Sequence, residues 1–378
     1  MQHMTRAAIT PLMMASKYGR LDLVRTFFGD ARVDLQVKDI RGLTAVELAK
    51  DDEVRNRIDD LVLLSTRPAA DGRITSVVRS FFVEDATVRL VLKSGGPNPN
   101  GTITVTTCRR SVADFEHLAK WLSIEQPASW IPTHFNLTSP FLIPSKPSRA
   151  VLRDTQLRLD AFLQCLLTHS TFSTHEMVWE FFLVPDIDPA MLADRAKHKA
   201  EIRVENVRDD YDPIIDTREV ESFVSHAKEQ LRGVSHAVKT LIRRTNAQRM
   251  LNSDLYDARL LNNTGVATLQ FLPRKYLIAF ERYTKALAPS ESDPLANSIA
   301  NSSTAVLVAL GRPTSLIGSM NQARRNIARA LGSLSRQSRW TPNIGLFDET
   351  RRSIAAEAEE KATKAQGELD SLGSELRY

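Results

Sequence analysis

The chain has 378 residues, of which 42% are hydrophobic and 25% charged, so it can form sizeable cores and is not disordered throughout. It has only 15 glycines and two cysteines, Cys108 and Cys165, which argues against glycine-rich cofactor loops, a disulfide scaffold and a cysteine-rich zinc module. A formal net charge of +5 permits an anionic membrane surface as partner but does not require nucleic acid.

The first segment, residues 5–64, has a helical pattern that contains a repeated phrase. Thr10 and Thr44 are 34 residues apart, and each opens a similar run of residues that ends in alanine. A threonine before a helix can cap it, and Pro11 in the first turn costs no hydrogen bond. The phrase resembles the ankyrin repeat, whose period is about 33 residues. The second copy is degenerate, with Ala45 in the place of the proline, and an ordinary helical hairpin is the alternative.

Two repeats are too few to bury a solenoid core, for which roughly three are needed. Either the repeats dock on the next domain of the chain, or the chain is the C-terminal part of a longer repeat protein. We favour the second interpretation.

The second segment, residues 72–190, changes from helical to strand-like periodicity. Three strand-like runs are rich in β-branched and aromatic residues, and a turn cluster at 94–101 separates the second run from the third. Helical patterns follow the third run. This order predicts an α+β domain with a three-stranded meander. The predicted strands are 74–82, 87–92 and 102–107, and the predicted helices are 112–122, 149–168 and 174–184, with a proline-rich loop at 127–147.

Four phrases of this segment, in this order, resemble the phox-homology (PX) domain. They are Arg109–Leu118 after the third strand, Ile143–Pro147 in the loop, Leu159–Leu167 in the long helix and Trp179–Leu183 near the end. The resemblance covers about 115 residues and implies a phosphoinositide-binding module.

Phosphoinositide headgroups require arginine forks and an aromatic platform. In PX domains that bind phosphatidylinositol 3-phosphate, an arginine lies four residues before the helix phenylalanine, and an aromatic residue lies three before it. With Phe115 as that phenylalanine, these positions hold Ser111 and Val112. Arg109 and Arg110 are close in sequence, but a shift along a strand end re-aims a side chain.

The resemblance also implies an arginine on the long helix, seven residues before its aromatic residue. With Phe162 as that residue, the position holds Thr155, flanked by Arg153 and Arg158 on different faces. Only the loop lysine has a candidate, Lys146. We therefore expect a degenerate headgroup pocket, with Arg109, Arg110, Lys146 and Arg158 as its remaining candidate contacts.

The third segment is polar and helical, with a linker at 191–216 and a long-helix region at 217–378. Apolar residues recur at spacings of three and four from Val220 to Leu241, the pattern of an amphipathic or coiled-coil helix. Long amphipathic helices behind a PX domain resemble the BAR half of a sorting nexin. A plain helical bundle is the alternative.

Basic residues cluster in two parts of this region and could face an anionic membrane. The candidates are Arg243 and Arg244 in one part and Arg324, Arg325 and Arg329 in the other. The alternative is an ordinary solvated helix face.

No phosphate-binding loop, zinc-protease motif or aromatic–basic pattern for nucleic acid is present, and the eight histidines are scattered. We expect no catalysis, metal, cofactor or nucleic-acid partner. The absence of an apolar leader or a membrane-length apolar run predicts a cytoplasmic protein, which is compatible with a peripheral location on a membrane.

The predicted organisation is a partial ankyrin array at 1–66, a PX domain at 72–190, a linker at 191–216 and a BAR-like region at 217–378. It resembles the C-terminal part of fungal VARP-like proteins, which carry an exchange-factor domain, ankyrin repeats, and PX and BAR domains. The resemblance implies a non-catalytic scaffold on endosomal membranes that pairs with a sorting nexin and binds a protein ligand through its repeats. The alternatives are a homodimeric, lipid-binding sorting nexin and an ankyrin adaptor with an unrelated bundle.

Overall fold

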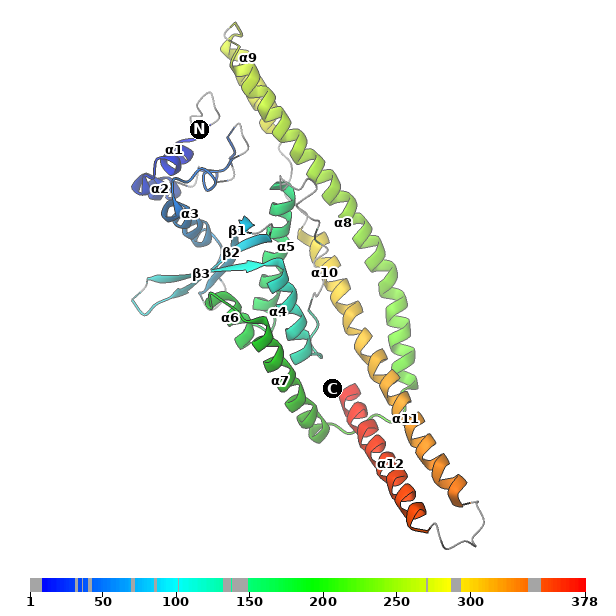
Figure 1. The fold of residues 1–378 in the computed structure, drawn as a ribbon. Coiled ribbons are helices and arrows are strands. Elements are labelled where there is room, and N and C mark those ends of the chain that lie inside the picture. The colour runs from blue at the N-terminus through cyan, green and yellow to red at the C-terminus, as the bar shows by residue number, and fades with distance from the viewer. Residues whose placement is uncertain are drawn as a thin grey trace. The chain divides into compact units, whose positions relative to one another are not determined.

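The computed structural model describes residues 9–30, 33–35, 37–39, 43–68, 72–84, 87–100, 102–131, 137, 149–269, 271–286, 294–338 and 348–378 (Figure 1). The chain divides into two compact units. The first comprises Met1–Leu118, Phe135–Ile187 and Lys239–Ser298, and the second comprises Ala119–His134, Asp188–Val238 and Ile299–Tyr378.

The N-terminal repeats form three helices, α1 (Pro11–Lys17), α2 (Leu21–Phe28) and α3 (Asp52–Leu64). The Thr10 hydroxyl accepts a hydrogen bond from the Met13 amide and caps α1, as its sequence predicts. The second phrase is different, because it forms a single turn closed by the Leu48 amide donating to the Thr44 carbonyl at 3.1 Å. The Ser16 hydroxyl donates to the Ala45 carbonyl and ties this turn to α1.

The three strands are β1 (Ile74–Glu84), β2 (Thr87–Pro97) and β3 (Ile103–Ser111), paired antiparallel in the order β1-β2-β3. This is the predicted meander, but β2 and β3 are longer than expected. Pairing continues through the glycines of the turn cluster, and the Asn98 amide closes the hairpin on the Thr102 carbonyl at 2.8 Å. β1 has an irregularity between Val77 and Arg79, so that Arg79 lies opposite Val91.

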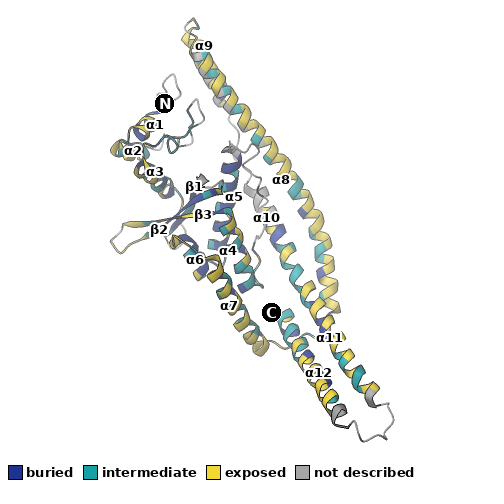
Figure 2. Ribbon diagram, viewed as in Figure 1, coloured by how far each residue is buried: buried dark blue, intermediate teal, exposed yellow. Residues whose placement is uncertain are grey.

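Three helices complete the α+β part: α4 (Val112–Glu125), α5 (Arg149–Thr168) and α6 (Glu176–Leu183). α5 has the predicted bounds. The ring of Phe115 packs edge-on against Phe181, with centroids 5.0 Å apart, and lies 6.5 Å from that of Phe162. These three buried rings join the three helices in one core, which Figure 2 shows in dark blue.

α5 is also fixed to β1 by polar side chains. The Asp160 carboxylate accepts hydrogen bonds from the Val77 amide at 2.8 Å and the Ser76 hydroxyl at 3.2 Å. The Gln164 side chain donates to the Thr75 carbonyl at 2.8 Å. Burial raises the pKa of Asp160, and these hydrogen bonds oppose that shift.

The last repeat helix, α3, packs directly on the sheet. Leu63 forms a buried apolar cluster with Ile74, Val78 and Val91. Lys93, which is also buried, forms an ion pair with Asp60 at 2.5 Å. The open end of the short array is therefore covered by the following domain, the arrangement that we expected less.

The remaining helices are α7 (Pro189–Asp210), α8 (Arg218–Ala267), α9 (Arg274–Ala286), α10 (Pro294–Ala309), α11 (Gly311–Ser338) and α12 (Asp348–Arg377). The segment expected as a linker, 191–216, is thus largely helical, because Asp188 caps α7 and Pro189 occupies its first turn. Only 211–217 connects α7 to α8. In the second unit α12 packs along α11 and also contacts α7.

The α7–α8 connection is fastened to the end of α12. The Ile214 amide donates to the Gly373 carbonyl at 3.1 Å, and Arg377 donates to the Asp212 carbonyl at 3.1 Å. Arg324 on α11 donates to the Ile215 carbonyl. The α7–α8 connection, α11 and α12 are therefore joined near the C-terminal end of α12.

Candidate lipid-headgroup site and pairing surface

The strand–helix junction at 111–114, where the PX resemblance predicts a headgroup arginine, is occupied by a helix cap. The Ser111 amide and hydroxyl donate to the Asp114 carboxylate at 2.7 Å and 2.9 Å, and the Asp114 amide donates back to the Ser111 hydroxyl at 3.3 Å. Asp114 therefore places a carboxylate at the position where the predicted headgroup pocket would need a cation. This arrangement favours the start of α4 and disfavours a phosphate.

Arg110 is directed into the protein and is 2% exposed. Its guanidinium donates to the carbonyls of Phe181 at 3.2 Å, Pro185 at 2.6 Å and Val184. Burial lowers the pKa of Arg110. Two residues earlier in the strand, the thiol of Cys108 donates to the Phe182 carbonyl at 3.1 Å. Arg110 thus fastens β3 to the end of α6 and does not face solvent.

The other headgroup candidates are not brought together as a pocket. Arg158 is paired with Asp154 at 2.8 Å on the same helix, one turn away. Thr155, at the expected arginine position of α5, is buried. Arg109 is exposed on β3. Lys146 lies outside the described residues. The described part of the site thus contains a cap, a buried structural arginine and an internal ion pair.

A second candidate surface runs along α8. Phe223, Val234 and Leu241 are 67%, 50% and 55% exposed, and they follow one side of the helix. Ala227, Gln230 and Ala237 lie between them at spacings of three and four, which is the seam pattern of helices that pair.

The neighbouring side of α8 already has partners. Val224, Ser235 and Ile242 are buried, and Lys228 donates to the Thr314 hydroxyl of α11 at 2.6 Å. The exposed seam is therefore a separate face from the one that packs inside the protein. Figure 2 shows most of α8 in the colour of exposed residues.

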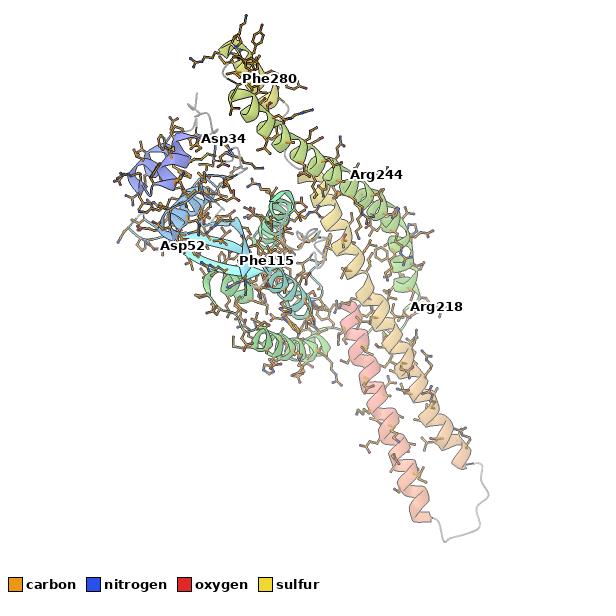
Figure 3. All side chains as sticks on the ribbon, turned by 45° about the horizontal axis from the view of Figure 1, so that its top comes forward. Asp34, Asp52, Phe115, Arg218, Arg244 and Phe280 are labelled. Atoms are coloured by element: carbon orange, nitrogen blue, oxygen red, sulfur yellow. The ribbon has the colours of Figure 1, made fainter. Side chains whose placement is uncertain are left out.

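The basic residues predicted to face a membrane are mostly solvent-exposed. Arg243 and Arg244 are exposed on α8, where Figure 3 labels Arg244, and Arg325 and Arg329 are exposed on α11. Arg324 differs, because its guanidinium is engaged with the Ile215 carbonyl and with Asn321 at 3.3 Å.

Membrane spans and metal centres are two features that the described residues do not contain. None of the helices among these residues is both long and apolar enough to cross a bilayer. Within the same part of the chain, no three or more histidine, cysteine, aspartate or glutamate side chains form a group that could hold a metal ion.

Comparison with known proteins identifies the N-terminal segment. Residues 5–49 match the family of ankyrin repeats (many copies), which confirms the ankyrin prediction. Over 231 residues, 60% of this chain, the sequence is 35% identical to a UPF0507 protein of Yarrowia lipolytica (strain CLIB 122 / E 150). That stretch is 21% of the relative, so the chain spans about a fifth of the length of the curated relative it matches. The chain therefore carries ankyrin-type repeats, a class of module that generally mediates protein–protein contact.

Two features of the structure were not predicted from the sequence. The role of Arg110 depends on carbonyls more than 70 residues later in the chain, and no local sequence pattern indicates such contacts. The aromatic residues of α9 could have been noticed, because Tyr276, Phe280 and Tyr283 follow helical spacing.

Proposed function

We propose that this chain is a non-catalytic scaffold of endosomal membrane traffic, a PX–BAR subunit similar to a sorting nexin. In this proposal the α+β part is a PX domain, and α8, α10, α11 and α12 form a BAR-like region. The observation that carries the proposal is the exposed apolar seam of α8, because a long helix with phenylalanine and leucine in solvent needs a second helix surface to cover it.

We further propose that the partner is a different sorting nexin. Phosphoinositide binding needs converging cations. Here Asp114 accepts the hydrogen bonds of Ser111 at the expected arginine position, Arg110 is buried and Arg158 is engaged with Asp154. A subunit with such a pocket would depend on its partner for lipid specificity. The ankyrin repeats would bind a further protein ligand.

The pairing is tested by light scattering of the full chain, alone and co-expressed with PX–BAR sorting nexins of the same organism. We expect a one-to-one complex with one of these partners, and we expect Phe223→Ser with Leu241→Ser to abolish it. His236→Ser is the matched control, since residue 236 is two positions from Val234 and so lies on the opposite side of α8. A chain that stays monomeric and forms a complex with none of these partners would contradict the proposal and favour the ankyrin adaptor.

A homodimer that binds lipid by itself is the second candidate, and the exposed arginines of α8 and α11 favour it. Vesicle flotation of the full chain separates the two proposals. We expect no preference for vesicles that contain phosphatidylinositol 3-phosphate over vesicles with the same charge from phosphatidylserine. Micromolar binding specific for the 3-phosphate would overturn the degenerate-pocket proposal.

A further inference from the structure

α9 forms a hairpin with the end of α8, and one side of α9 is used for this contact. The Asn263 side chain on α8 donates to the Phe280 carbonyl at 3.2 Å and to the Thr284 hydroxyl. Thr284 is buried and Leu277 is half-buried. The contact fixes which sides of α9 remain available.

The next side of α9 carries a stripe of aromatic rings in solvent. Tyr276, Phe280 and Tyr283 are spaced by four and three residues, so they lie along one side of the helix. They are 48%, 47% and 58% exposed, and Phe271, just before the helix, is 79% exposed. Figure 3 labels Phe280 at this hairpin.

The hairpin is also strongly cationic. Residues 259–286 contain five basic residues and one acidic residue. Arg274, Lys275 and Arg282 are exposed on α9. The Lys275 ammonium lies 5.1 Å from the centre of the Tyr276 ring, and the Arg259 guanidinium lies 5.9 Å from that of Tyr283. Two of the cations, Arg259 and Lys275, therefore lie against the aromatic rings.

We propose that α9 is an interfacial helix that inserts its aromatic stripe, Tyr276, Phe280 and Tyr283, into the headgroup region of an anionic membrane. Tyrosine combines an apolar ring with a polar tip and so suits the boundary between lipid and water. The flanking cations match anionic lipid, and a helix of this composition lies in the membrane plane. The inference goes beyond the proposed scaffold function, because the stripe is separate from the pairing seam of α8 and requires no dimer.

A fluorescent label at the stripe tests the proposal directly. NBD is attached at Phe280→Cys in the full chain carrying Cys165→Ser, since the other cysteine, Cys108, is buried. The probes are vesicles of phosphatidylcholine alone and of phosphatidylcholine with phosphatidylserine. We expect a blue shift of NBD emission only with the anionic vesicles, and no shift for the label at Ile278→Cys, which lies on the opposite side of α9.

Variants give an independent readout. Phe280→Ser with Tyr283→Ser should weaken vesicle binding about ten-fold. Neutralising Arg259 and Lys275, which lie against the rings of the stripe, should weaken it about five-fold per charge, with the effect reduced at high salt. Ile278→Ser should leave binding unchanged.

Three results would overturn the proposal. One is unchanged emission at position 280 while the chain is bound to vesicles, and another is a full chain that does not bind anionic vesicles. The third is a shift that grows with protein concentration in the absence of vesicles, which would assign the stripe to a contact between copies. Failure of the α8 pairing is distinguishable, because light scattering reports it without any label on α9.

Discussion

Asp59 on α3 and Arg79 on β1 form an ion pair at 2.8 Å in which the carboxylate is 1% exposed and the guanidinium 16% exposed. The pair links the last ankyrin helix to the sheet. It depends on the irregularity of β1 after Val77, which places Arg79 opposite Val91 on the side of the sheet that α3 covers. The repeats and the α+β part are thus joined by a desolvated contact.

Removing one partner of this pair should be costly. Asp59→Ala takes the carboxylate away from a largely buried guanidinium, and we expect a loss of about 3 kcal/mol in the free energy of unfolding, measured with urea. Asp52→Ala is the matched control on the same helix. Asp52 is 75% exposed and pairs with Arg55, so its loss should cost less than about 1 kcal/mol.

A double variant distinguishes the attraction between the two charges from the cost of burying them. Because the cost of desolvating two ions offsets most of their attraction, Asp59→Leu with Arg79→Met should recover much of the stability lost by Asp59→Ala. Equal effects of Asp59→Ala and Asp52→Ala would show that α3 does not pack on the sheet in solution.

The same carboxylate predicts a pH dependence of stability. Burial is the largest influence on Asp59 and outweighs Arg79, raising its pKa from 3.8 to about 6. At a pH between these two values, the Asp59 carboxyl holds a proton in the folded protein and releases it in the unfolded chain. Stability contributed by this group is therefore complete below about pH 4 and is lost as pH rises to about 6, by roughly 3 kcal/mol.

The Asp59→Asn variant checks the direction of this pH dependence. Its amide cannot ionise, so the difference in unfolding free energy between wild type and variant should change across pH 4–6 and stay constant above about pH 6.5. A difference that does not vary with pH would mean that the Asp59 carboxyl is not desolvated in the folded protein.

Local patterns predicted much of the fold. The Thr10 cap, the three-stranded meander and the bounds of α5 follow from capping residues and periodicity over a few turns or strands. The second ankyrin phrase failed as a helix predictor because Lys50 donates its amide to the Ser16 carbonyl of the first repeat, a contact 34 residues distant. Tertiary contact overrode local propensity there.

The features of the candidate sites also differ in whether the sequence could predict them. The apolar spacing of the α8 seam could be predicted, because it is a property of one helix. The burial of Arg110 could not be predicted, because an arginine near the end of a strand looks the same in the sequence whether it faces a lipid or carbonyls far along the chain. Here it faces the carbonyls of Phe181, Val184 and Pro185. The irregularity that aims Arg79 at α3 likewise has no local residue signal in β1.

Arg110 gives a prediction that distinguishes its structural role from lipid binding. Arg110→Ala removes charge-assisted hydrogen bonds from three carbonyls, so the free energy of unfolding should fall by about 3 kcal/mol. Arg109→Ala, on the same strand but exposed, should cost less than about 1 kcal/mol. Thermal unfolding in the absence of lipid checks both. Equal and small losses would make Arg110 a candidate lipid contact again.

Two glycines of α12 should respond in opposite directions to the same substitution. A Cβ at Gly373 would lie 2.9 Å from the Ile214 carbonyl oxygen and from the Pro213 Cβ, where backbone must move. A Cβ at Gly367 would meet only the Arg208 guanidinium at 3.7 Å, an ordinary contact. Helix propensity alone favours alanine at both positions by about 1 kcal/mol.

We therefore expect Gly367→Ala to stabilise the protein by about 0.5–1 kcal/mol and Gly373→Ala to destabilise it by about 1–3 kcal/mol. The loss arises because the α7–α8 connection is displaced from the end of α12, which breaks the hydrogen bond from the Ile214 amide. Thermal unfolding measures the stabilities, and hydrogen exchange of the Ile214 amide reports the displacement. Stabilisation by both alanines would show that the connection does not rest on α12 in solution.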